Sequence, residues 1–561
     1  MAVEVSRLLD YNNSTLLLGA AVVLLYAVRS YLQPVPLAHP LLLGRQSDVG
    51  KVRKVGETAV YRNYGVGHGA ALPARPRKEV NLAHDVLHSD STREQYLWGT
   101  KITNEKLRLR IQALGNGLVR TVGLAPNKSS AIILLDDSFV NVPEWLFIDL
   151  TLSTFGMTSI TLTQLKLLGS VLSRGVPDVI FTDSSLLELI LEQVAEEGNH
   201  FPIVVVGKDA ASKVEAGRNL GFNVVTLDEV ERSGKGGENT TIDKIKPADI
   251  FSTAYHGVTK ETPTGVHITH MNLTSGPTAI RQFFTLTSPL SPASTVLSAF
   301  PLATPFGRAI AYTALLEGSN FATLASTSLL QSAKATIRPT LDEIVRAASS
   351  GIPRPTHLFI LPDHLDTLRS SIIAHASSSF YSGWAWGRKL VDLAGGALAE
   401  NTFFDRIGGL NQARRATLGY SKTEPWLNAV VAAGGPCDES QFPSARIALS
   451  IPLINAHIEY ISTAPIFASH PFDLQHFPPS VAESYAHVGP PGPNIEVKLV
   501  AVSDDSQVDE TKGDPRGKVF YRGPSLCEPI PPLASGPVGE QWVDSGRIAV
   551  IHSNGTFNIL E

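Results

Sequence analysis

The chain has 561 residues, of which 43% are hydrophobic and 18% are charged. These proportions are typical of a globular protein, and the length is sufficient for two or three packed subdomains. The formal net charge is -5, with 47 basic and 52 acidic side chains. The sequence therefore lacks the basic excess that binding to a nucleic acid backbone requires, and we expect no nucleic acid partner.

The N-terminal residues 1–33 are predicted to form a membrane anchor. Residues 16–28 are all apolar or small, and the run continues past Arg29 to Leu32. About 17 helical residues cover about 25 Å, which is short for a membrane span. A signal peptide and a buried or interfacial helix are the alternatives, but no small-x-small cleavage site follows the run.

The basic residues near the anchor indicate its orientation. Five of them lie at or after the end of the run, namely Arg29, Arg45, Lys51, Arg53 and Lys54. By the positive-inside rule, the protein is single-pass with its body in the cytosol and membrane lipid as a partner. A short span suits the thin bilayer of the endoplasmic reticulum. The two cysteines, Cys437 and Cys527, are far apart and fit a reducing compartment without a disulfide framework or a zinc site.

The rest of the chain has the pattern of an α/β protein. Residues 34–94 are rich in Pro, Gly and basic residues and are interpreted as a tether and entry segment. Short apolar runs at 131–135, 179–182 and 203–206 are typical of buried parallel strands, and residues 185–196 between two of them have helical spacing. This alternation predicts a parallel α/β sheet.

Residues 249–272 contain the most informative motif. A strand-like run is followed by a loop with hydroxyl groups and glycines, and then by a segment typical of a helix. Backbone N–H groups in such a loop can turn towards an anion, so this segment is a candidate phosphate cradle. A polar loop that only connects two core elements is the alternative.

In this segment the sequence resembles the adenylate-forming (AMP-binding) synthetase superfamily and, within it, the long-chain fatty acid–CoA ligases. Their phosphate loop reads Tyr-Thr-Ser-Gly-Thr-Thr-Gly-x-Pro-Lys-Gly-Val, followed by Thr-His-x-Asn. Eight residues are in register with it: Tyr255, Thr259, Pro263, Gly265, Val266, Thr269, His270 and Asn272. Blocks at 300–308, 433–436, 487–498 and 517–524 match further family motifs in the family's order.

The resemblance covers roughly residues 95–561. It implies the α/β fold of the large N-terminal domain of these synthetases, with stacked mixed sheets, helices and a small β-barrel-like subdomain, here preceded by one transmembrane helix. It also implies ATP or AMP and magnesium as cofactors. The residues that it places at the nucleotide are Tyr255, Thr259, Gly265, Gly434, Gly435, Pro436 and Asp544.

Several departures from the family pattern concern the phosphate loop. Val258 and Glu261 replace glycines, Lys260 replaces a hydroxyl residue, and Thr264 replaces the loop lysine. A Cβ at a glycine position can block the approach of the backbone to phosphate, and Glu261 adds a negative charge beside the triphosphate.

Two further departures concern magnesium and ribose. Ile461 stands where the family has the glutamate that binds magnesium, and Glu459 is two residues out of register. We therefore assign no metal ligand and no catalytic residue. Arg547 stands on the aspartate that holds the ribose, and an arginine cannot accept hydrogen bonds. Asp544 could replace that aspartate only with a remodelled loop.

The family also continues into a C-terminal lid, which carries a lysine for adenylation and builds the thiolation site. The sequence ends at Glu561, before that lid, so we expect the lid to be absent or supplied or replaced by a protein partner. Aromatic residues at 383–386 and 403–404 fall in the family's helical insertion and either line an acyl channel or pack in the core.

These observations leave two functions open. The first is a membrane-anchored long-chain acyl-CoA synthetase, which converts fatty acid, ATP and CoA to acyl-CoA, AMP and pyrophosphate, and if active is an ATP-dependent acid–thiol ligase. The second is a pseudoenzyme that binds acyl chains, acyl-CoA or adenine nucleotide, or acts as a scaffold at the membrane. The lost carboxylate and lysine predict impaired or absent catalysis, because one well-placed electrostatic group is worth about 3 kcal/mol.

Overall fold

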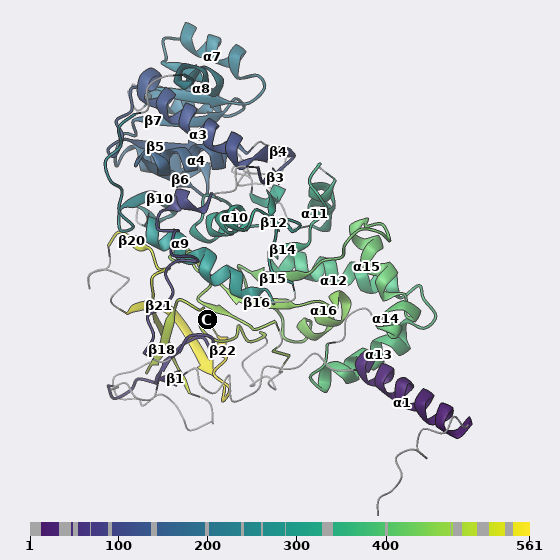
Figure 1. Cartoon of the computed structure of the whole chain (residues 1–561). Helices are drawn as coiled ribbons and strands as arrows, with labels where there is room; N and C mark the ends of the chain where they lie inside the picture. The colour runs from purple at the N-terminus through teal and green to yellow at the C-terminus, as the bar shows by residue number, and fades with distance from the viewer. Residues whose placement is uncertain are drawn as a thin grey trace, which may run out of the picture.

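The computed structural model describes residues 13–32, 47–48, 54–67, 69–87, 92–135, 143–196, 201–236, 240–259, 262–285, 288–327, 340–349, 351–398, 402–471, 473–474, 485–501, 515–532 and 542–560. Three sheets organise these residues, two with eight strands and one with six. Figure 1 shows the first sheet and its helices at one end of the molecule, the second sheet in the middle, and the third beside it.

The first sheet has the order β20-β11-β10-β6-β5-β7-β8-β9. Its six strands from β10 to β9 are parallel, and β11 pairs antiparallel with both of its neighbours, β10 and β20. The predicted parallel strands are confirmed, and their unbroken apolar runs reflect burial on both faces. The strands are β5 (Ser130–Leu134), β6 (Thr158–Leu162), β7 (Val179–Asp183), β8 (Ile203–Val206), β9 (Val224–Thr226), β10 (Ile250–Thr259), β11 (Thr262–Thr269) and β20 (Glu528–Ile530).

Helices flank this sheet at both faces, as expected for crossovers between parallel strands. They are α3 (Asn104–Gly117), α4 (Glu144–Thr154), α5 (Leu168–Leu172), α6 (Leu187–Glu196), α7 (Ala210–Asn219) and α8 (Leu227–Gly234). The predicted helix over residues 185–196 is α6. Helices α3 and α8 pack so closely that a Cβ on Gly117 would lie 1.9 Å from the carbonyl oxygen of Val230.

The second sheet has the order β17-β16-β15-β14-β12-β13-β3-β4, with parallel strands from β16 to β3. Its strands are β3 (Glu94–Leu97), β4 (Thr100–Thr103), β12 (Thr295–Ser298), β13 (Asn320–Thr323), β14 (His357–Ile360), β15 (Ala429–Ala433), β16 (Leu453–His457) and β17 (Phe467–Ala468). Around it lie α9 (His270–Ile280), α10 (Pro305–Glu317), α11 (Leu341–Ala348), α12 (Pro362–Ala376), α13 (Ser382–Ala394), α14 (Phe403–Ile407), α15 (Leu410–Leu418) and α16 (Phe442–Leu449).

A buried charged cluster joins helices α4 and α10 between the first two sheets. Asp149 and Arg308 are both fully buried, with Asp149 Oδ1 3.6 Å from Arg308 Nη1. Tyr312 donates a hydrogen bond to Asp149 Oδ2 at 2.7 Å, and Arg308 donates one to Thr161 Oγ1 at 3.1 Å. Because charges this far from water are costly without partners, the cluster fixes how the helices pack.

The third sheet is antiparallel, with the order β1-β2-β18-β19-β21-β22. Its strands are β1 (Ser47–Asp48), β2 (Val60–Tyr61), β18 (Glu496–Val500), β19 (Arg516–Arg522), β21 (Val543–Ile551) and β22 (Phe557–Ile559). The resemblance implies a small β-barrel-like unit here. The pairing among the described residues instead gives a linear strand order with two ends.

Part of the segment predicted as a tether belongs to the folded body. Strand β2 pairs with β18, and Arg62 forms a buried ion pair with Glu496. The short helix η3 (Ala83–Val86) also packs with α4, α9 and α10. Residues 34–94 therefore include structural parts of the body. Their Pro and Gly content is typical of a linker, so the sequence did not predict these contacts.

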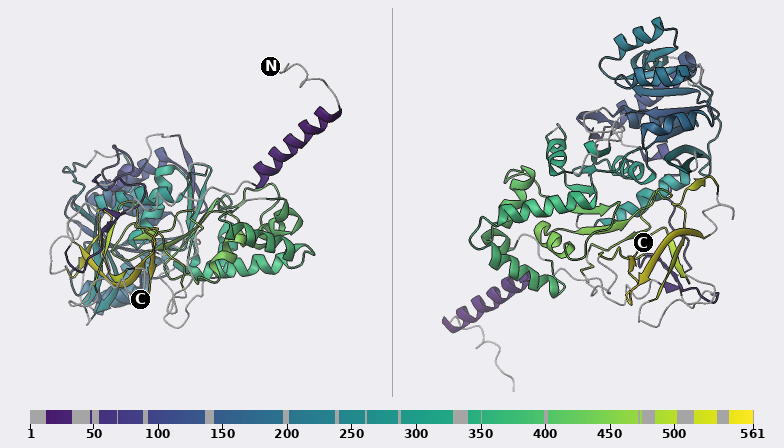
Figure 2. Two further views of the ribbon diagram at one scale, coloured as in Figure 1. Left: turned by 90° about the horizontal axis from the view of Figure 1, so that it is seen from below. Right: turned by 180° about the vertical axis from the view of Figure 1, so that it is seen from behind.

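The N-terminal residues form helix α1 (Asn13–Leu32), which projects from the end of the molecule that carries α13 and α14 (Figures 1 and 2). Within the part of the chain that the structure describes, no helix is both long enough and apolar enough to cross a membrane. The prediction of a transmembrane anchor over residues 1–33 is therefore corrected: the described part of this segment is a helix, α1, that does not meet the length and apolarity of a membrane span.

Candidate functional site

A cavity of about 1280 Å³ lies where the three sheets meet. Its walls come from the β10–β11 hairpin, the segments that follow β12, β14 and β15, residues 457–461 at and after the end of β16, and strand β21. Helix α10 contributes Phe306. The cavity exceeds the usual 300–1,000 Å³ of a small-molecule pocket, so it has room for a ligand larger than a single nucleoside.

The wall of the cavity contains both apolar and polar side chains. Apolar lining residues include Phe300, Phe306, Leu361, Ile458, Ile461 and Val488. The polar lining residues include two carboxylates, Glu459 and Asp544, and two cations, Lys166 and Arg547. Because the fixed charges balance, the wall lacks the positive excess that a triphosphate requires.

The candidate phosphate loop is a paired β-hairpin. Strand β10 continues to Thr259, and its residues face β11 in the register Tyr255 with Gly265, Gly257 with Thr264, and Thr259 with Thr262. Residues on both sides of the turn are therefore paired as strands. The predicted loop is wrong in this respect, although the helix expected after it is confirmed as α9, with Thr269 as its N-cap.

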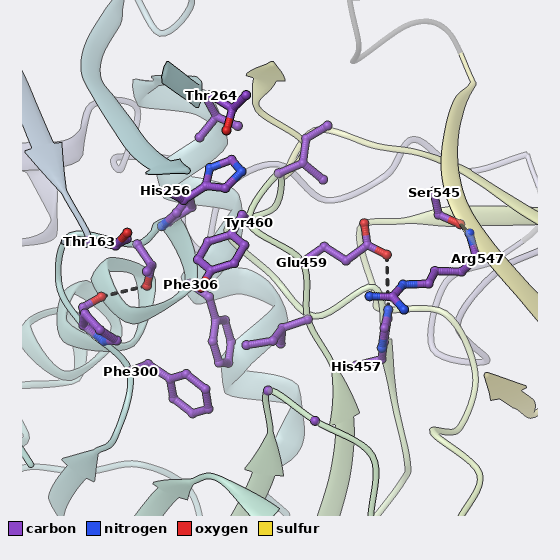
Figure 3. A pocket seen from close by; sticks show the side chains of 18 of the residues that line it. Thr163, His256, Thr264, Phe300, Phe306, His457, Glu459, Tyr460, Ser545 and Arg547 are labelled. Atoms are coloured by element: carbon purple, nitrogen blue, oxygen red, sulfur yellow. Dashed lines mark hydrogen bonds and ion pairs between the residues drawn. The ribbon is translucent and has the colours of Figure 1, made fainter. Parts of the chain in front are cut away.

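A β-bulge in this hairpin directs His256 into the cavity. The register shifts between Tyr255 and Gly257, so His256 is the extra residue, and bulges commonly re-aim a side chain in this way. The His256 ring stacks on Tyr460, with ring centroids 4.6 Å apart and planes 2° apart (Figure 3). Burial lowers the pKa of His256, which favours the neutral ring in the stack.

A second group of contacts surrounds Glu459. Tyr521 donates a hydrogen bond to Oε2 of this carboxylate, and His457 Nε2 lies 3.2 Å from Oε1. Burial and the neighbouring Glu459 charge raise the pKa of Tyr521 well above its usual value, so its hydroxyl remains a donor. Figure 3 shows Arg547 extending from β21 towards His457 and Glu459. Both oxygens of Glu459 are therefore already engaged.

The structure brings most of the predicted nucleotide residues to this cavity. Gly265, Gly434, Gly435, Pro436 and Asp544 line it. Gly434 has a φ of +86°, a left-handed conformation that favours glycine. A Cβ at this position would also lie 2.9 Å from Leu361 Cδ2, so the residue type is set by the turn and its packing.

The other two predicted residues lie differently. Tyr255 packs against the hydrophobic cluster of the first sheet, and burial raises its pKa. The backbone of Thr259 pairs with Thr262 near the end of the hairpin.

The sequence analysis missed His256 and Tyr460 as a stacked pair, and His457 as a partner of Glu459. Aromatic and histidine residues at 256 and 457–460 were a visible signal, but the bulge that turns His256 inward has no sequence signature of its own.

The AMP-binding enzyme family model matches residues 87–529, which is more than half of the chain. The chain belongs to the AMP-binding enzyme family. Solved structures with the same fold include a long-chain-fatty-acid-CoA ligase (FadD1) from Archaeoglobus fulgidus, at 14% identity and a TM-score of 0.58, covering 88% of this chain and 85% of that one. The anthranilate CoA ligase AuaEII in complex with anthranoyl-AMP has 14% identity and a TM-score of 0.59, covering 87% and 78%.

Curated relatives of this family member include a long-chain fatty acid–CoA ligase and a long-chain acyl-CoA synthetase. Long-chain-fatty-acid–CoA ligase 1 of Homo sapiens is 22% identical over 437 residues, which is 75% of this chain and 57% of the relative. Long chain acyl-CoA synthetase 7, peroxisomal, of Arabidopsis thaliana is 24% identical over 501 residues, which is 85% of this chain and 63% of the relative. The chain thus spans less than two thirds of the length of either.

The family uses ATP and AMP. The described residues fit the adenine base of such a ligand better than the divalent cation that accompanies its phosphates. The turn at Gly434 to Pro436 borders the cavity, and a Cβ added to Gly435 would be in ordinary contact with the Pro362 ring at 3.4 Å. A divalent cation fits poorly. Ile461 provides only a backbone carbonyl, which already accepts a hydrogen bond from the Cys527 N–H at 2.7 Å. Among the described residues, no group of three or more His, Cys, Asp or Glu side chains is placed to hold a metal ion.

Proposed function

We propose that this AMP-binding family member binds a long-chain acyl ligand or an adenine nucleotide in the cavity and performs adenylation poorly or not at all. The observation that carries the proposal is the β10–β11 hairpin, in which Gly257 to Thr259 pair with Thr262 to Thr264 where the family motif predicts an open phosphate loop. The side chains add to this effect. The His256–Tyr460 stack fills the space beside the hairpin, and Ile461 provides no carboxylate.

The chemistry available to the chain's own residues supports binding better than turnover. The apolar wall around Phe300 and Phe306 can hold an alkyl chain, while the turn at Gly434 can hold a planar base. In the transition state of adenylation, negative charge must be balanced by groups aimed at the phosphates. Arg547 and Lys166 line the cavity, but Glu459 and Asp544 oppose their charge.

Two isoleucines in the cavity wall provide a matched test. Ile461→Glu restores a carboxylate at the family position, whereas Ile458→Glu adds the same charge three residues away. Calorimetry should detect AMP or a long-chain fatty acid binding to the unchanged protein. AMP release from ATP, magnesium, fatty acid and CoA should stay at background for the unchanged protein and for both variants, because the hairpin remains paired. A rise for Ile461→Glu alone would show that the missing carboxylate limits catalysis and would overturn the role given to the hairpin. Failure of both ligands to bind would overturn the proposal, as would turnover by the unchanged protein.

The second candidate is an active long-chain acyl-CoA ligase, which the names of the curated relatives favour. The same assay distinguishes it, because the unchanged protein would then release AMP and form acyl-CoA at a rate that depends on the fatty acid.

We also propose that the protein works beside a membrane, with its body in the cytosol and the endoplasmic reticulum as the host membrane. The apolar run at 16–28 and the basic residues after it support this proposal. Fatty acids partition into bilayers, so an acyl-binding cavity held there would meet concentrated ligand. Fractionation of cells with a protease-protection step tests both the membrane and the orientation.

A further inference from the structure

A patch of exposed aromatic and apolar side chains covers the outer side of helices α13 and α14. We call it the aromatic patch, and it consists of Phe380, Tyr381, Trp384, Val391 and Phe403. Phe380 is 93% exposed, Trp384 58% and Phe403 57%. The sequence analysis expected this region to line an acyl channel or to pack in the core. The structure places Trp384 and Phe403 on the surface, whereas Trp386 is partly buried against the core, and none of the residues of the patch lines the cavity.

Ring contacts and buried ion pairs hold the patch in place. Trp384 and Val391 are seven residues apart and therefore lie on the same face of α13. Trp384 packs edge-on against Phe404 at 4.9 Å between ring centroids, and Phe404 packs against Phe403 at 6.0 Å. Beneath the patch, Asp405 of α14 binds Lys389 of α13 and Arg414 of α15 in buried ion pairs at 2.6 and 2.8 Å. These contacts hold the exposed rings in place without covering them.

Helix α1 projects from this same end of the molecule, as both views in Figure 2 show. Its large apolar residues between Leu16 and Val28 are 43–75% exposed. Several of them are consecutive, from Val22 to Tyr26, and successive helical residues point about 100° apart. The helix is therefore apolar on all sides. A protein groove would cover one side only, whereas the interfacial layer of a bilayer can contact more of the helix surface.

The chemistry of the patch points to the same surroundings. Tryptophan and tyrosine have an apolar ring and a polar tip, and they concentrate at the boundary between lipid headgroups and acyl chains. The exposed charges beside them on α13 and α14 include Arg388, which pairs with Asp392, and Arg406. Their net positive charge complements anionic lipid headgroups.

We propose that the aromatic patch is a membrane-contact surface, which rests in the interfacial layer of a lipid bilayer while the exposed apolar side chains of α1 lie in the same layer beside it. Two contacts at one end of the molecule fix the orientation of the body, which a single flexible attachment does not. The proposal does not depend on the ligand of the cavity, because the patch and the cavity share no residue.

The test uses the full chain with vesicles of phosphatidylcholine alone or mixed with phosphatidylserine. The double variant Trp384→Ser/Phe403→Ser should partition onto both kinds of vesicle roughly tenfold more weakly than the unchanged protein, since two apolar rings no longer leave water. The matched control is Leu109→Ser/Leu220→Ser, which removes two apolar residues, 64% and 72% exposed, from the far end of the molecule. It should bind like the unchanged protein.

A second readout locates the patch in the lipid. Brominated lipids should quench tryptophan fluorescence on binding, and Trp384→Phe should remove part of this quenching while keeping the affinity. Equal partitioning of the patch variant and the control would overturn the proposal. So would a concentration-dependent dimer that the patch variant alone abolishes while its vesicle binding is unchanged, because the patch would then cover a second copy of the chain. Far-UV circular dichroism and the urea unfolding midpoint of each variant report whether the body still folds.

Discussion

Two glycines in the β10–β11 hairpin allow a direct test of its closed structure. A Cβ added to Gly265 would lie 2.5 Å from the carbonyl oxygen of Ala254 and 2.9 Å from Tyr255 Cδ1. The first of these atoms is backbone, so the paired strands would have to separate. Overpacking of this kind typically costs about 1–3 kcal/mol. A Cβ on Gly257 would meet only Thr264 Oγ1 at 3.1 Å, which a side-chain rotation relieves.

Gly265→Ala should therefore lower the free energy of unfolding by about 1–3 kcal/mol, and Gly257→Ala by less than about 1 kcal/mol. The two variants differ only in their place in the same hairpin, and neither glycine has a positive φ. Urea unfolding, followed by far-UV circular dichroism, measures the difference in midpoint at constant slope. If the segment were instead an open loop, both variants would unfold at the same urea concentration, and that result would refute the hairpin argument.

Two further predictions concern the stability of the body. Asp149→Asn leaves the buried Arg308 without its counter-charge and should lower the free energy of unfolding by about 3–5 kcal/mol. A decrease below about 1 kcal/mol in urea unfolding would show that the cluster does not fix how the helices pack. Burial lowers the pKa values of His270 and His357 to about 4, against about 6.5 in an unfolded chain. The unfolded state thus binds more protons between these values, so the stability that each histidine contributes is complete above about pH 6.5 and is lost as the pH falls towards 4. The slope is up to about 1.4 kcal/mol per pH unit for each histidine, and His357→Gln should flatten it in urea titrations between pH 7 and pH 5.

The fold could be predicted to a large extent because its signals are local or ordered along the chain. The strands at 131–135, 179–182 and 203–206 are buried on both faces, so their apolar runs are unbroken. The blocks around 300–308 and 433–436 indicate the same fold through their order. Residues 54–87 escaped prediction because their contacts, such as Arg62 with Glu496, join positions 434 residues apart.

Several residues that line the cavity could be predicted from the sequence, but the backbone conformation of the hairpin could not. Gly434, Gly435 and Pro436 border the cavity as expected, because a turn after a buried strand is set by local sequence. The pairing of β10 with β11 and the inward turn of His256 arise from strand register, which a loop motif does not encode. The aromatic residues of α13 and α14 show the same limit, because aromatic composition alone does not distinguish a channel wall from an exposed surface.

The central claim is that the paired hairpin and the residue at position 461 prevent formation of an adenylate. Exchange of labelled pyrophosphate into ATP, in the presence of magnesium and a long-chain fatty acid, measures that half-reaction alone. The account predicts no exchange above a protein-free control, under conditions in which calorimetry detects bound ligand. Exchange that requires both the protein and the fatty acid would contradict it.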